Sequence, residues 1–498
     1  MTLDFDTCYR AVVARDPRFD GRFFTGVTST GIYCRPICPA RTPARRNLRF
    51  FPHAGAAEAA GFRACRRCRP EASPGSPDWN TRADLAARAV RLIADGYADQ
   101  HGISGLARRL AVTDRHLRRL LLAELGTTPI ALARTTRLQT ARRLLAETRM
   151  PVTEIAFASG FSSIRQFNAS FQEVYAQPPS ALRRPGGPGG QEAPGDAAAD
   201  GTWLTLRLAC REPFDGPSLL GFLAARAIPG VEHVDQDRYA RTIRAPGGSG
   251  IIELVPPPTA RQGQVLLRVR LTGLKGVGQV VSRCRKLFDL DAEPQAISAV
   301  LAADDILAPL IAARPGLRVP GAYDGFELAV RAVLGQQVSV SAARTFAGRL
   351  AGRYGTPLTA AGEPGPGDVG GTLTVLFPTP AGLADADLSG LGLTTGRQAT
   401  LRALATACAA GKLNLDAGAD PEETAARLAE LPGVGPWTAA YILMRAGGDP
   451  DAFPGTDLGV RRAMERLGCE PGRADRWRPW RAYAALHLWA FLTEAPAV

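Results

Sequence analysis

The sequence contains no apolar run that approaches the roughly 20 residues needed for a membrane-spanning helix. Its first residues, Met1 to Asp6, also lack the basic region and following apolar stretch of a signal peptide. We therefore expect a cytoplasmic protein without a membrane partner. With 498 residues and 45% hydrophobic content, the chain should be globular but is too long for one core, and about three domains are expected.

Disulfide bonds are not expected, because a cytoplasmic chain keeps its thiols reduced. Five of the nine cysteines stand alone in the sequence and should be small buried side chains. The other four form two tight pairs: Cys34 lies four positions before Cys38, and Cys65 lies three positions before Cys68. Such spacing lets both sulfurs of a pair reach one ion, so the four cysteines predict a tetrahedral Zn²⁺ site.

The basic excess of the chain lies in its first third. Residues 1–184 carry 29 Lys and Arg against 15 Asp and Glu, whereas the remainder carries 31 against 32. The excess is nearly all arginine and crowds both cysteine pairs; Arg41 and Arg45 are two of these residues. A basic segment of this kind favours a polyanion through counterion release, so we expect DNA contacts here. The alternative is that the charge serves solubility alone.

Stretches rich in Gly and Pro divide the chain. Residues 71–79 have the composition of a linker and residues 185–201 that of a flexible tether. Loop 355–372 is flanked by helical patterns and is interpreted as an insertion within a domain. The predicted fold class is therefore multidomain and mainly α with α+β parts. Its units are a small zinc-binding α+β domain over 1–75, an all-α domain over 79–184, an α+β subdomain over 202–285 and a helical domain over 286–498.

Residues 103–121 and 152–171 form two similar helical blocks. Apolar side chains fall on inward faces in both, and these are Leu106, Leu110, Leu117, Leu121, Phe167 and Phe171. The expected caps and turns are Ser104, Thr113, Gly160 and Ser162. Each block predicts a helix-turn-helix whose second helix can enter a major groove.

The second helix of each block carries side chains that can contact phosphates or base edges. These are Arg115, Arg118, Arg119, Arg165 and Gln166. The alternative is a plain helical bundle with solvated charges, but two such blocks joined by a helix favour binding of double-stranded DNA. Including the Gly126-Thr-Thr-Pro129 element between the blocks, the unit resembles the AraC-type DNA-binding domain.

The cysteine domain resembles the N-terminal methylphosphotriester-repair domain of the Ada family, from Ala14-Arg-Asp-Pro through Gly61-Phe-Arg-Ala-Cys65. This resemblance assigns all four cysteines to Zn²⁺ and makes Cys34 the methyl acceptor. Methylation of one thiolate would change the charge of the centre from about −2 to about −1 and weaken its repulsion from DNA. The resemblance thus implies a sensor whose methylation activates transcription, with RNA polymerase as an expected partner. An inert zinc knuckle is the alternative.

The third unit begins with an alternating stretch from Trp203, a helix-like segment from Leu219 and strand-like runs over 239–243, 250–255 and 265–271. Farther along, the sequence Leu-Pro-Gly433-Val-Gly435-Pro predicts a tight hairpin between two helices. Backbone N–H groups at such a hairpin can hold a phosphate without reading the base sequence. A single hairpin of this kind is weak evidence for DNA binding. Its value rises because a carboxylate, Asp457, follows 22 residues after Gly435.

A helix-hairpin-helix followed by Gly, Pro and Asp resembles the helix-hairpin-helix DNA glycosylase superfamily, and specifically the AlkA-type 3-methyladenine glycosylases. The resemblance implies that Asp457 is the catalytic carboxylate, which stabilises an oxocarbenium-like sugar and orients or activates water. Asp457 could also cap the helix over 458–467, and the two roles are compatible. A monovalent cation at the hairpin is a further expected ligand.

The same resemblance places Phe222, Trp437, Tyr441 and Trp489 around the flipped base. Aromatic faces attract the delocalised positive charge of N-alkylated purines and demand no specific hydrogen bond, so a broad substrate range is expected. Without the family pattern, each of these aromatics would be interpreted as a core residue.

Two positions depart from the AlkA pattern. Gln337 matches the wedge that fills the space of the flipped base, where the best-known AlkA enzymes have Leu. Ala490 stands where those enzymes have Tyr, which reshapes the pocket. Relatives with lyase activity have Lys at the position of Trp437, so its absence predicts a monofunctional hydrolase.

The resemblances together predict a bifunctional protein of the DNA alkylation-damage response. Cys34 would repair methylphosphotriesters and switch on transcription, while the C-terminal domain would excise 3-methyladenine and related bases. The alternative is a transcription regulator with a catalytically inactive glycosylase-like module. The sequence has no Pro-Cys-His-Arg element of the O⁶-alkylguanine transferases, so we do not expect repair of O⁶-methylguanine.

Overall fold

The computed structural model describes residues 4–16, 19–68, 70, 85–148, 150–182, 203–258, 263–358, 372–416, 418–470 and 472–494. The predicted linkers over 71–79 and 185–201, and residues 359–371 of the predicted insertion, lie outside this set. By internal contacts the chain forms two compact units. One contains residues 1–209, 245–248 and 270–282, and the other contains the rest. Within the described residues, no helix has the length and apolar character to cross a membrane.

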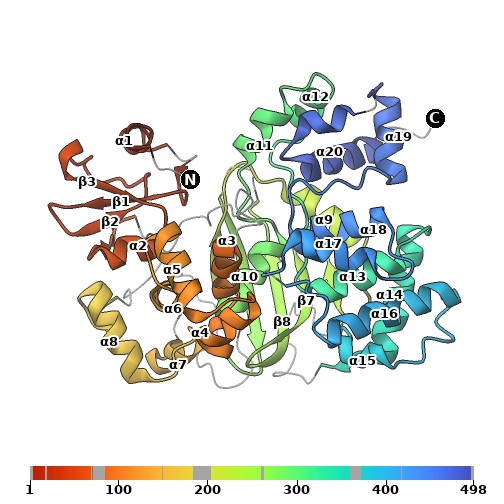
Figure 1. Cartoon of the computed structure of the whole chain (residues 1–498), viewed down its shortest axis with the longest axis horizontal. Helices are drawn as coiled ribbons and strands as arrows, with labels where there is room; N and C mark the ends of the chain where they lie inside the picture. The colour runs from red at the N-terminus through yellow and green to blue at the C-terminus, as the bar shows by residue number, and fades with distance from the viewer. Residues whose placement is uncertain are drawn as a thin grey trace. The chain divides into compact units, whose positions relative to one another are not determined.

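The first part of unit 1 is a small four-stranded sheet in the order β3-β1-β2-β4 (Figure 1). Its strands are β1 (Phe24–Val27), β2 (Ile32–Cys34), β3 (Leu48–Phe51) and β4 (Arg63–Ala64), and helices α1 (Phe5–Ala14) and α2 (Ala54–Ala59) accompany them. Strands β2 and β4 are parallel, with Tyr33 opposite Ala64. Cys34 directly follows Tyr33, and Cys65 directly follows Ala64. This register therefore brings the two cysteine pairs to the same end of the sheet.

Six helices follow in the first unit: α3 (Leu85–Ala94), α4 (Tyr97–Arg109), α5 (Asp114–Leu125), α6 (Pro129–Glu147), α7 (Val152–Ala158) and α8 (Ile164–Tyr175). Helices α4 and α5 form the first helix-turn-helix, and α7 and α8 the second. The four leucines and two phenylalanines predicted to face inward are all buried, at 3% exposure or less. Thr113 caps α5 as predicted, because its hydroxyl accepts a hydrogen bond from the His116 N–H.

Two predicted caps were wrong. Ser163, not Ser162, caps α8 by accepting from the Gln166 N–H, while the Ser162 hydroxyl donates to the Gln166 side chain. Ser104 lies inside α4, which kinks at Gly102, and its hydroxyl donates to the Asp114 carboxylate at 2.6 Å. Neighbouring hydroxyls can serve the same helix end, so the sequence alone locates a cap only to within a residue or two.

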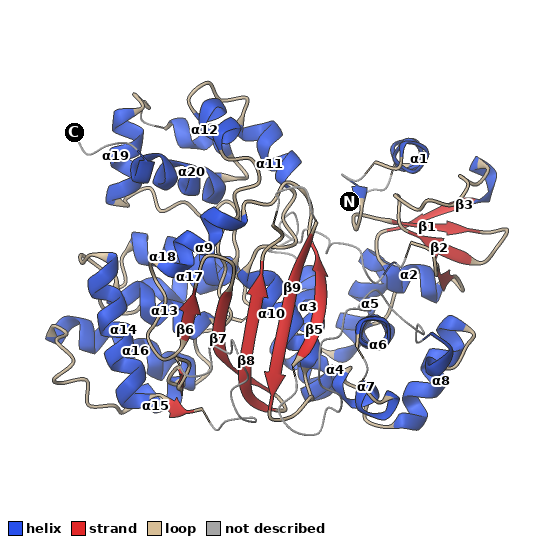
Figure 2. Cartoon of the chain, turned by 180° about the vertical axis from the view of Figure 1, so that it is seen from behind, coloured by secondary structure: helices blue, strands red, loops and turns tan. Residues whose placement is uncertain are grey.

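The C-terminal part begins with a five-stranded sheet in the order β5-β9-β8-β7-β6. Its strands are β5 (Leu204–Ala209), β6 (Glu232–Val234), β7 (Tyr239–Ala245), β8 (Gly248–Val255) and β9 (Gln264–Leu271), and helices α9 (Gly216–Ala224) and α10 (Val277–Leu287) accompany them. Strands β5, β9 and β8 run side by side in Figure 2. The three strand-like runs and the helix from Leu219 were predicted; the short edge strand β6 was not.

The remaining elements are mainly helical. They are α11 (Pro294–Leu301), α12 (Leu307–Ala313), α13 (Gly325–Leu334), α14 (Val340–Tyr354), α15 (Pro380–Ala384), α16 (Thr395–Ala409), α17 (Pro421–Ala429), α18 (Pro436–Ile442), α19 (Leu458–Arg466) and α20 (Arg481–Glu494), with a hairpin of β10 (Thr356–Pro357) and β11 (Val375–Leu376). Helix α13 is buried along most of its length and lies at the centre of a core that also includes residues of α14, α16 and α18. This core fixes the hairpin between α17 and α18.

Candidate functional site

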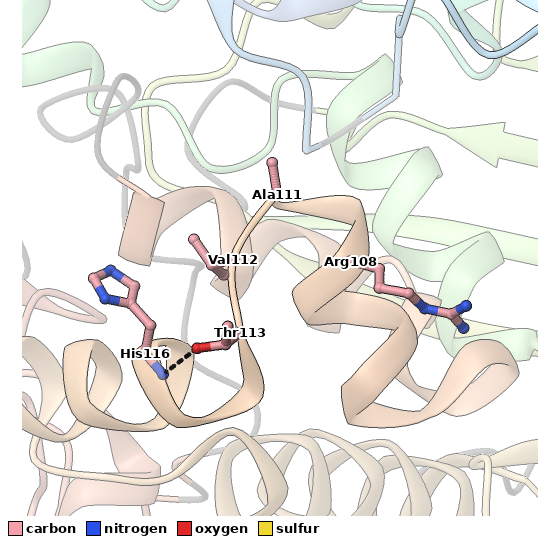
Figure 3. Close-up of a pocket in the computed structure, with 5 residues that line it drawn as sticks. All are labelled: Arg108, Ala111, Val112, Thr113 and His116. Atoms are coloured by element: carbon pink, nitrogen blue, oxygen red, sulfur yellow. Dashed lines mark hydrogen bonds between the residues drawn. The ribbon is translucent and has the colours of Figure 1, made fainter.

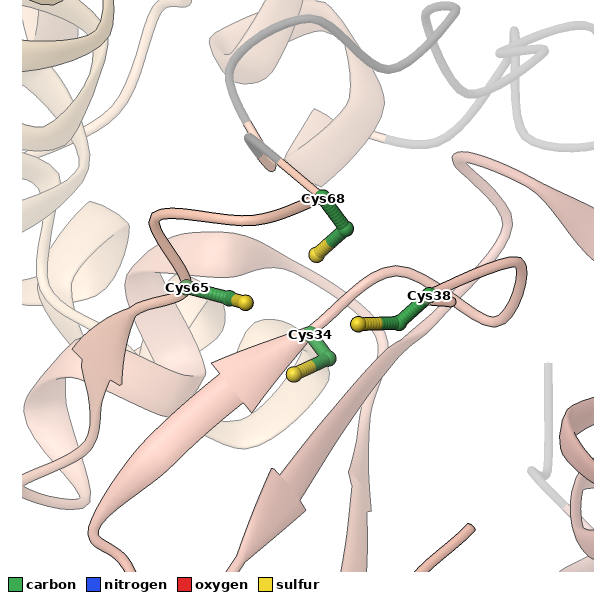
Figure 4. Close-up of side chains that lie close together, drawn as sticks. All are labelled: Cys34, Cys38, Cys65 and Cys68. Carbon is green, nitrogen blue, oxygen red and sulfur yellow. The ribbon is translucent and has the colours of Figure 1, made fainter. Parts of the chain in front are cut away.

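The four predicted zinc ligands converge. The Sγ atoms of Cys34, Cys38, Cys65 and Cys68 all lie within 4.8 Å of one another, and Figure 4 shows them directed toward a common centre. Hydrogen bonding to the neighbouring cysteines, together with burial, raises the pKa of the Cys34 thiol far above its usual range. Four thiolates can share so small a space only around a cation, and four sulfur donors in a closed cluster fit Zn²⁺.

The four sulfurs differ in their surroundings. The Arg35 backbone N–H donates to the Cys68 sulfur at 3.3 Å. An N–H donor withdraws charge from a thiolate and weakens it as a nucleophile. Cys34 and Cys38 are half-buried, whereas Cys65 and Cys68 are buried.

Some arginines around the cluster make contacts within the domain, and others are exposed to solvent. Arg35 is a brace, because it pairs with the buried Asp20 and donates to the Cys68 carbonyl at 3.1 Å. Arg45 pairs with Asp6 and lies 5.0 Å from the ring centroid of Phe5. Arg41 is exposed. The basic surface predicted from the sequence is thus partly engaged in holding the domain together.

Two side chains of helix α6 contact the zinc-binding part. Thr135 donates to Glu58 at 2.5 Å, and the other oxygen of Glu58 accepts from Tyr33, the residue before Cys34. The buried Arg142 donates to the Cys65 carbonyl at 3.3 Å, and its guanidinium lies 5.0 Å from the ring centroid of Tyr175 in α8.

One helix therefore touches both a metal-ligand segment and the second recognition helix. These contacts were not predicted from the sequence, although Arg142 stands among the apolar positions of α6 that are buried.

The predicted base- and phosphate-contacting side chains lie on the second helix of each helix-turn-helix. Arg115, Arg118, Arg119, Arg165 and Gln166 are all exposed. An open recess of about 550 Å³ lies at the turn of the first block and is lined by Arg108, Ala111, Val112, Thr113 and His116. In Figure 3 the side chains of Arg108 and His116 extend in opposite directions, so no polar groups converge in this hollow. It has the features of a surface recess and not of a ligand site.

In the C-terminal unit, Asp457 caps α19 and is held by two tryptophans. One carboxylate oxygen accepts from Trp437 Nε1 at 2.8 Å. The other accepts from Trp489 Nε1 at 2.8 Å and from the Val460 N–H at 3.0 Å. These three hydrogen bonds fix the direction of the carboxylate. Because Asp457 is only half-buried, it keeps some contact with solvent. The cap predicted as an alternative role is confirmed.

Three of the four predicted aromatic residues lie together beside this carboxylate. Trp437 and Tyr441 stack with ring centroids 5.4 Å apart, and Tyr441 and Trp489 lie 6.4 Å apart. All three are half-buried, as is Phe222. Trp437 and Tyr441 lie one helical turn apart on one face of α18, so their rings are neighbours. Helix α20 supplies the third ring, that of Trp489.

Two arginines that the sequence analysis did not single out complete the group. The Arg226 guanidinium lies 3.7 Å from the Phe222 ring centroid, and that of Arg445 lies 4.9 Å from it. Arg445 also donates to the Tyr441 hydroxyl at 2.7 Å. Burial alone would raise the pKa of Tyr441, but Arg445 and Arg226 outweigh it, and this pKa lies below its ordinary value. Two guanidiniums therefore lie near the Phe222 ring.

The hairpin between α17 and α18 has the predicted glycines, but they differ. Gly433 has a left-handed φ of +77°, and a Cβ there would meet the Thr400 hydroxyl at 2.3 Å. Gly435 is extended and would meet nothing within 4 Å, so its bare backbone faces open space. Pro436 begins α18 as predicted. Gln337, the predicted wedge, is exposed and takes a φ of +54°.

Four family models match the chain in succession. They are the metal binding domain of Ada over 7–71, a helix-turn-helix domain over 106–185, the AlkA N-terminal domain over 205–324 and the HhH-GPD superfamily base excision DNA repair protein over 330–477. Together with the four-cysteine cluster, the Ada match makes the N-terminal part a binding site for one Zn²⁺. The other matches support DNA binding and a DNA glycosylase domain.

One of the relatives matches nearly the whole chain, and two others match parts of it. A Mycobacterium tuberculosis protein named "Probable bifunctional transcriptional activator/DNA repair enzyme AlkA" is 48% identical over 98% of this chain and 97% of its own length. DNA-3-methyladenine glycosylase 2 of Escherichia coli is 37% identical over 56% of this chain and 94% of its own. The Escherichia coli bifunctional transcriptional activator/DNA repair enzyme Ada is 35% identical over 37% of this chain and 50% of its own. The chain therefore belongs to the family of bifunctional transcriptional activator/DNA repair enzymes of the AlkA type.

Proposed function

We propose that Cys34 accepts a methyl group from DNA methylphosphotriesters. Its thiolate attacks the methyl carbon, the new S–CH₃ bond replaces the O–CH₃ bond, and the phosphate leaves as an ordinary diester anion. Bound Zn²⁺ would keep the Cys34 sulfur deprotonated yet nucleophilic at neutral pH. The observations that support this assignment are the convergence of the four sulfurs and the partial exposure of Cys34, which leaves its sulfur within reach of a DNA phosphate.

Methylation removes one negative charge from the zinc centre and so favours DNA binding by the whole basic segment. We propose that the methylated protein then grips its promoter through Arg41, Arg45 and the exposed side chains of α5 and α8, and activates RNA polymerase. The site of action would be the cytoplasm, where the promoter lies.

We further propose that the C-terminal part is a monofunctional hydrolase that excises 3-methyladenine and related bases. The observation that carries this is the carboxylate of Asp457, which both tryptophans orient beside the aromatic group. As the C1′–N bond breaks, the base leaves with the bonding electrons, and the carboxylate stabilises the positive sugar and orients the water that adds to it. Trp437 supplies no amine for a Schiff base, so the strand is not cut.

The flipped base would lie among Phe222, Trp437, Tyr441 and Trp489, with Gln337 filling the space it leaves in the duplex. Gly433 and Gly435 would hold the DNA backbone through N–H groups, and a monovalent cation at this hairpin would add to that contact.

The glycosylase proposal is tested with duplex DNA that contains 3-methyladenine. We expect release of the free base and an intact strand with an abasic site. Release no faster than by an Asp457→Asn variant would favour the rival reading, a regulator with an inactive module. The methyl-transfer proposal is tested by mass spectrometry after exposure to methylphosphotriester DNA. The Cys34 peptide should gain the mass of one methyl group, and a gain on another cysteine would refute the assignment.

A further inference from the structure

We propose that Gln336 is a positioning residue that ties the wedge at Gln337 to the DNA-holding hairpin and to the helix that carries Trp437. The inference rests on the proposed glycosylase function and names a residue that acts through others. Gln336 lies in the short turn between α13 and α14, directly before Gln337.

The side-chain amide of Gln336 bridges two parts of the helix-hairpin-helix. Its Nε2 lies 2.8 Å from the Gly433 carbonyl oxygen and 2.9 Å from the Thr438 hydroxyl. A carbonyl oxygen only accepts, so the amide must point its nitrogen toward Gly433. Both N–H bonds of the amide are then used, one for each partner.

The backbone of Gln336 is held as well. Arg397 donates to the Gln336 carbonyl at 2.5 Å, and its guanidinium lies 5.9 Å from the ring centroid of Phe346 in α14. The next residue, Gln337, has a left-handed φ of +54°. An L-residue adopts this backbone at a cost of about 1 kcal/mol, and it persists where the surroundings over-determine it. The held backbone of Gln336 is such a constraint.

The two partners of the amide lead to the two other working parts of the site. Gly433 is fixed in the hairpin, because its left-handed backbone fits closely against Thr400. Thr438 is buried at 2% exposure and follows Trp437, which holds the Asp457 carboxylate. One amide therefore links the wedge, the hairpin and the carboxylate.

This arrangement has a consequence for base flipping. A wedge residue can enter a paired duplex only if its position is fixed relative to the hairpin that binds the DNA backbone. Loss of the Gln336 link should slow extrusion of a paired base, whereas hydrolysis of a base that is already unpaired needs no wedge. A residue that merely supports the fold would affect both substrates alike.

The test uses the full chain, single-turnover kinetics and two substrates. One is a duplex with a single 7-methylguanine paired with cytosine, and the other carries the same base in a one-nucleotide bulge. Gln336→Glu keeps the shape of the side chain but cannot donate to the Gly433 carbonyl. Thr438→Val removes only the second partner. Gln398→Glu is the matched control, because the Gln398 amide donates to the Leu393 carbonyl at 3.0 Å within another helix start.

We expect Gln336→Glu to slow release of the paired base about 10-fold, the loss that corresponds to one hydrogen bond at a partly exposed site. Release from the bulge should fall less than about threefold, and the control should change neither rate. Thr438→Val should shift the ratio of the two rates in the same direction. Equal slowing on both substrates, or no slowing, would overturn the inference while leaving the glycosylase proposal intact. Failure of the unsubstituted chain on both substrates would instead remove the proposed function, and this inference with it.

Discussion

Trp437 donates its indole N–H to one oxygen of Asp457 at 2.8 Å, from a position 20 residues earlier in the chain. Because Trp489 and the Val460 N–H occupy the other oxygen, the carboxylate cannot rotate freely. The residue that caps a helix is thus also the residue presented to the aromatic group. A fixed carboxylate of this kind stabilises developing positive charge without having to reorganise.

Replacement of Asp457 by Asn should abolish base release while the chain stays folded. Asn is a good helix cap, so α19 should persist. The amide carries no charge, and its NH₂ group would face one of the two indole N–H donors. We expect single-turnover excision of an N-methylated purine to fall by at least about 100-fold. Asp420→Asn, a capping carboxylate at the start of α17, is the control and should retain the full rate.

Replacement of Cys34 by Ala should remove methyl transfer but not base excision. The cysteine cluster and Asp457 belong to different compact units, so loss of one sulfur should leave the tryptophan–carboxylate contacts unchanged. Transfer is measured as methyl incorporation from methylphosphotriester DNA, and excision as release of methylated purine. Cys408→Ala, outside the cluster, should leave both intact. Persistent transfer in the Cys34 variant would mean that another sulfur is the acceptor.

Replacement of Arg142 by Met should weaken both zinc retention and promoter binding. The buried guanidinium holds the Cys65 carbonyl and lies against Tyr175 of the second recognition helix, so its loss leaves a carbonyl without its donor. A cost of about 1–3 kcal/mol is expected. Zinc release to a chelator and binding of a promoter duplex are the measurements. Arg134→Met on the same helix, where the side chain pairs with Glu173 near the surface, should change zinc release little.

Asp289 should make the C-terminal unit less stable as the pH rises. Burial raises the pKa of its carboxyl group from the ordinary 3.8 to about 6. The folded state therefore binds this proton more tightly than the unfolded state. The contribution of the Asp289 carboxyl group to the free energy of unfolding is fully present below pH 3.8 and is lost as the pH rises through about 6. The loss is at most about 3 kcal/mol, because the side chain keeps some contact with solvent.

Asp289→Asn tests this, because Asn still accepts from the Tyr483 hydroxyl and the Val319 N–H and tolerates the left-handed φ of +50°. Urea unfolding of both proteins at pH 4 and pH 7 should show the variant gaining stability relative to the unsubstituted chain at the higher pH. A difference that does not change with pH would show that Asp289 titrates normally.

Local spacing was enough to predict several parts of the molecule. The two cysteine pairs, the buried leucines of the first helix-turn-helix, the Gly433 turn and the cap at Asp457 all depend on residues a few positions apart. Backbone geometry over such distances is restricted, so composition and spacing determine which atoms can meet. The choice between Ser162 and Ser163 as a cap marks the limit of this reasoning, because both hydroxyls lie within reach of the same helix end.

Packing decided the rest. The Gln336 amide meets Gly433 across 97 residues, Arg142 meets Cys65 across 77, and Trp489 meets Asp457 across 32. Arg445 likewise reaches Phe222 from a separate element. No periodicity reports such pairs, because their separation depends on how whole helices and strands pack. The sequence by itself determined which chemical groups this protein carries and their local settings, and the tertiary structure decided which of them touch.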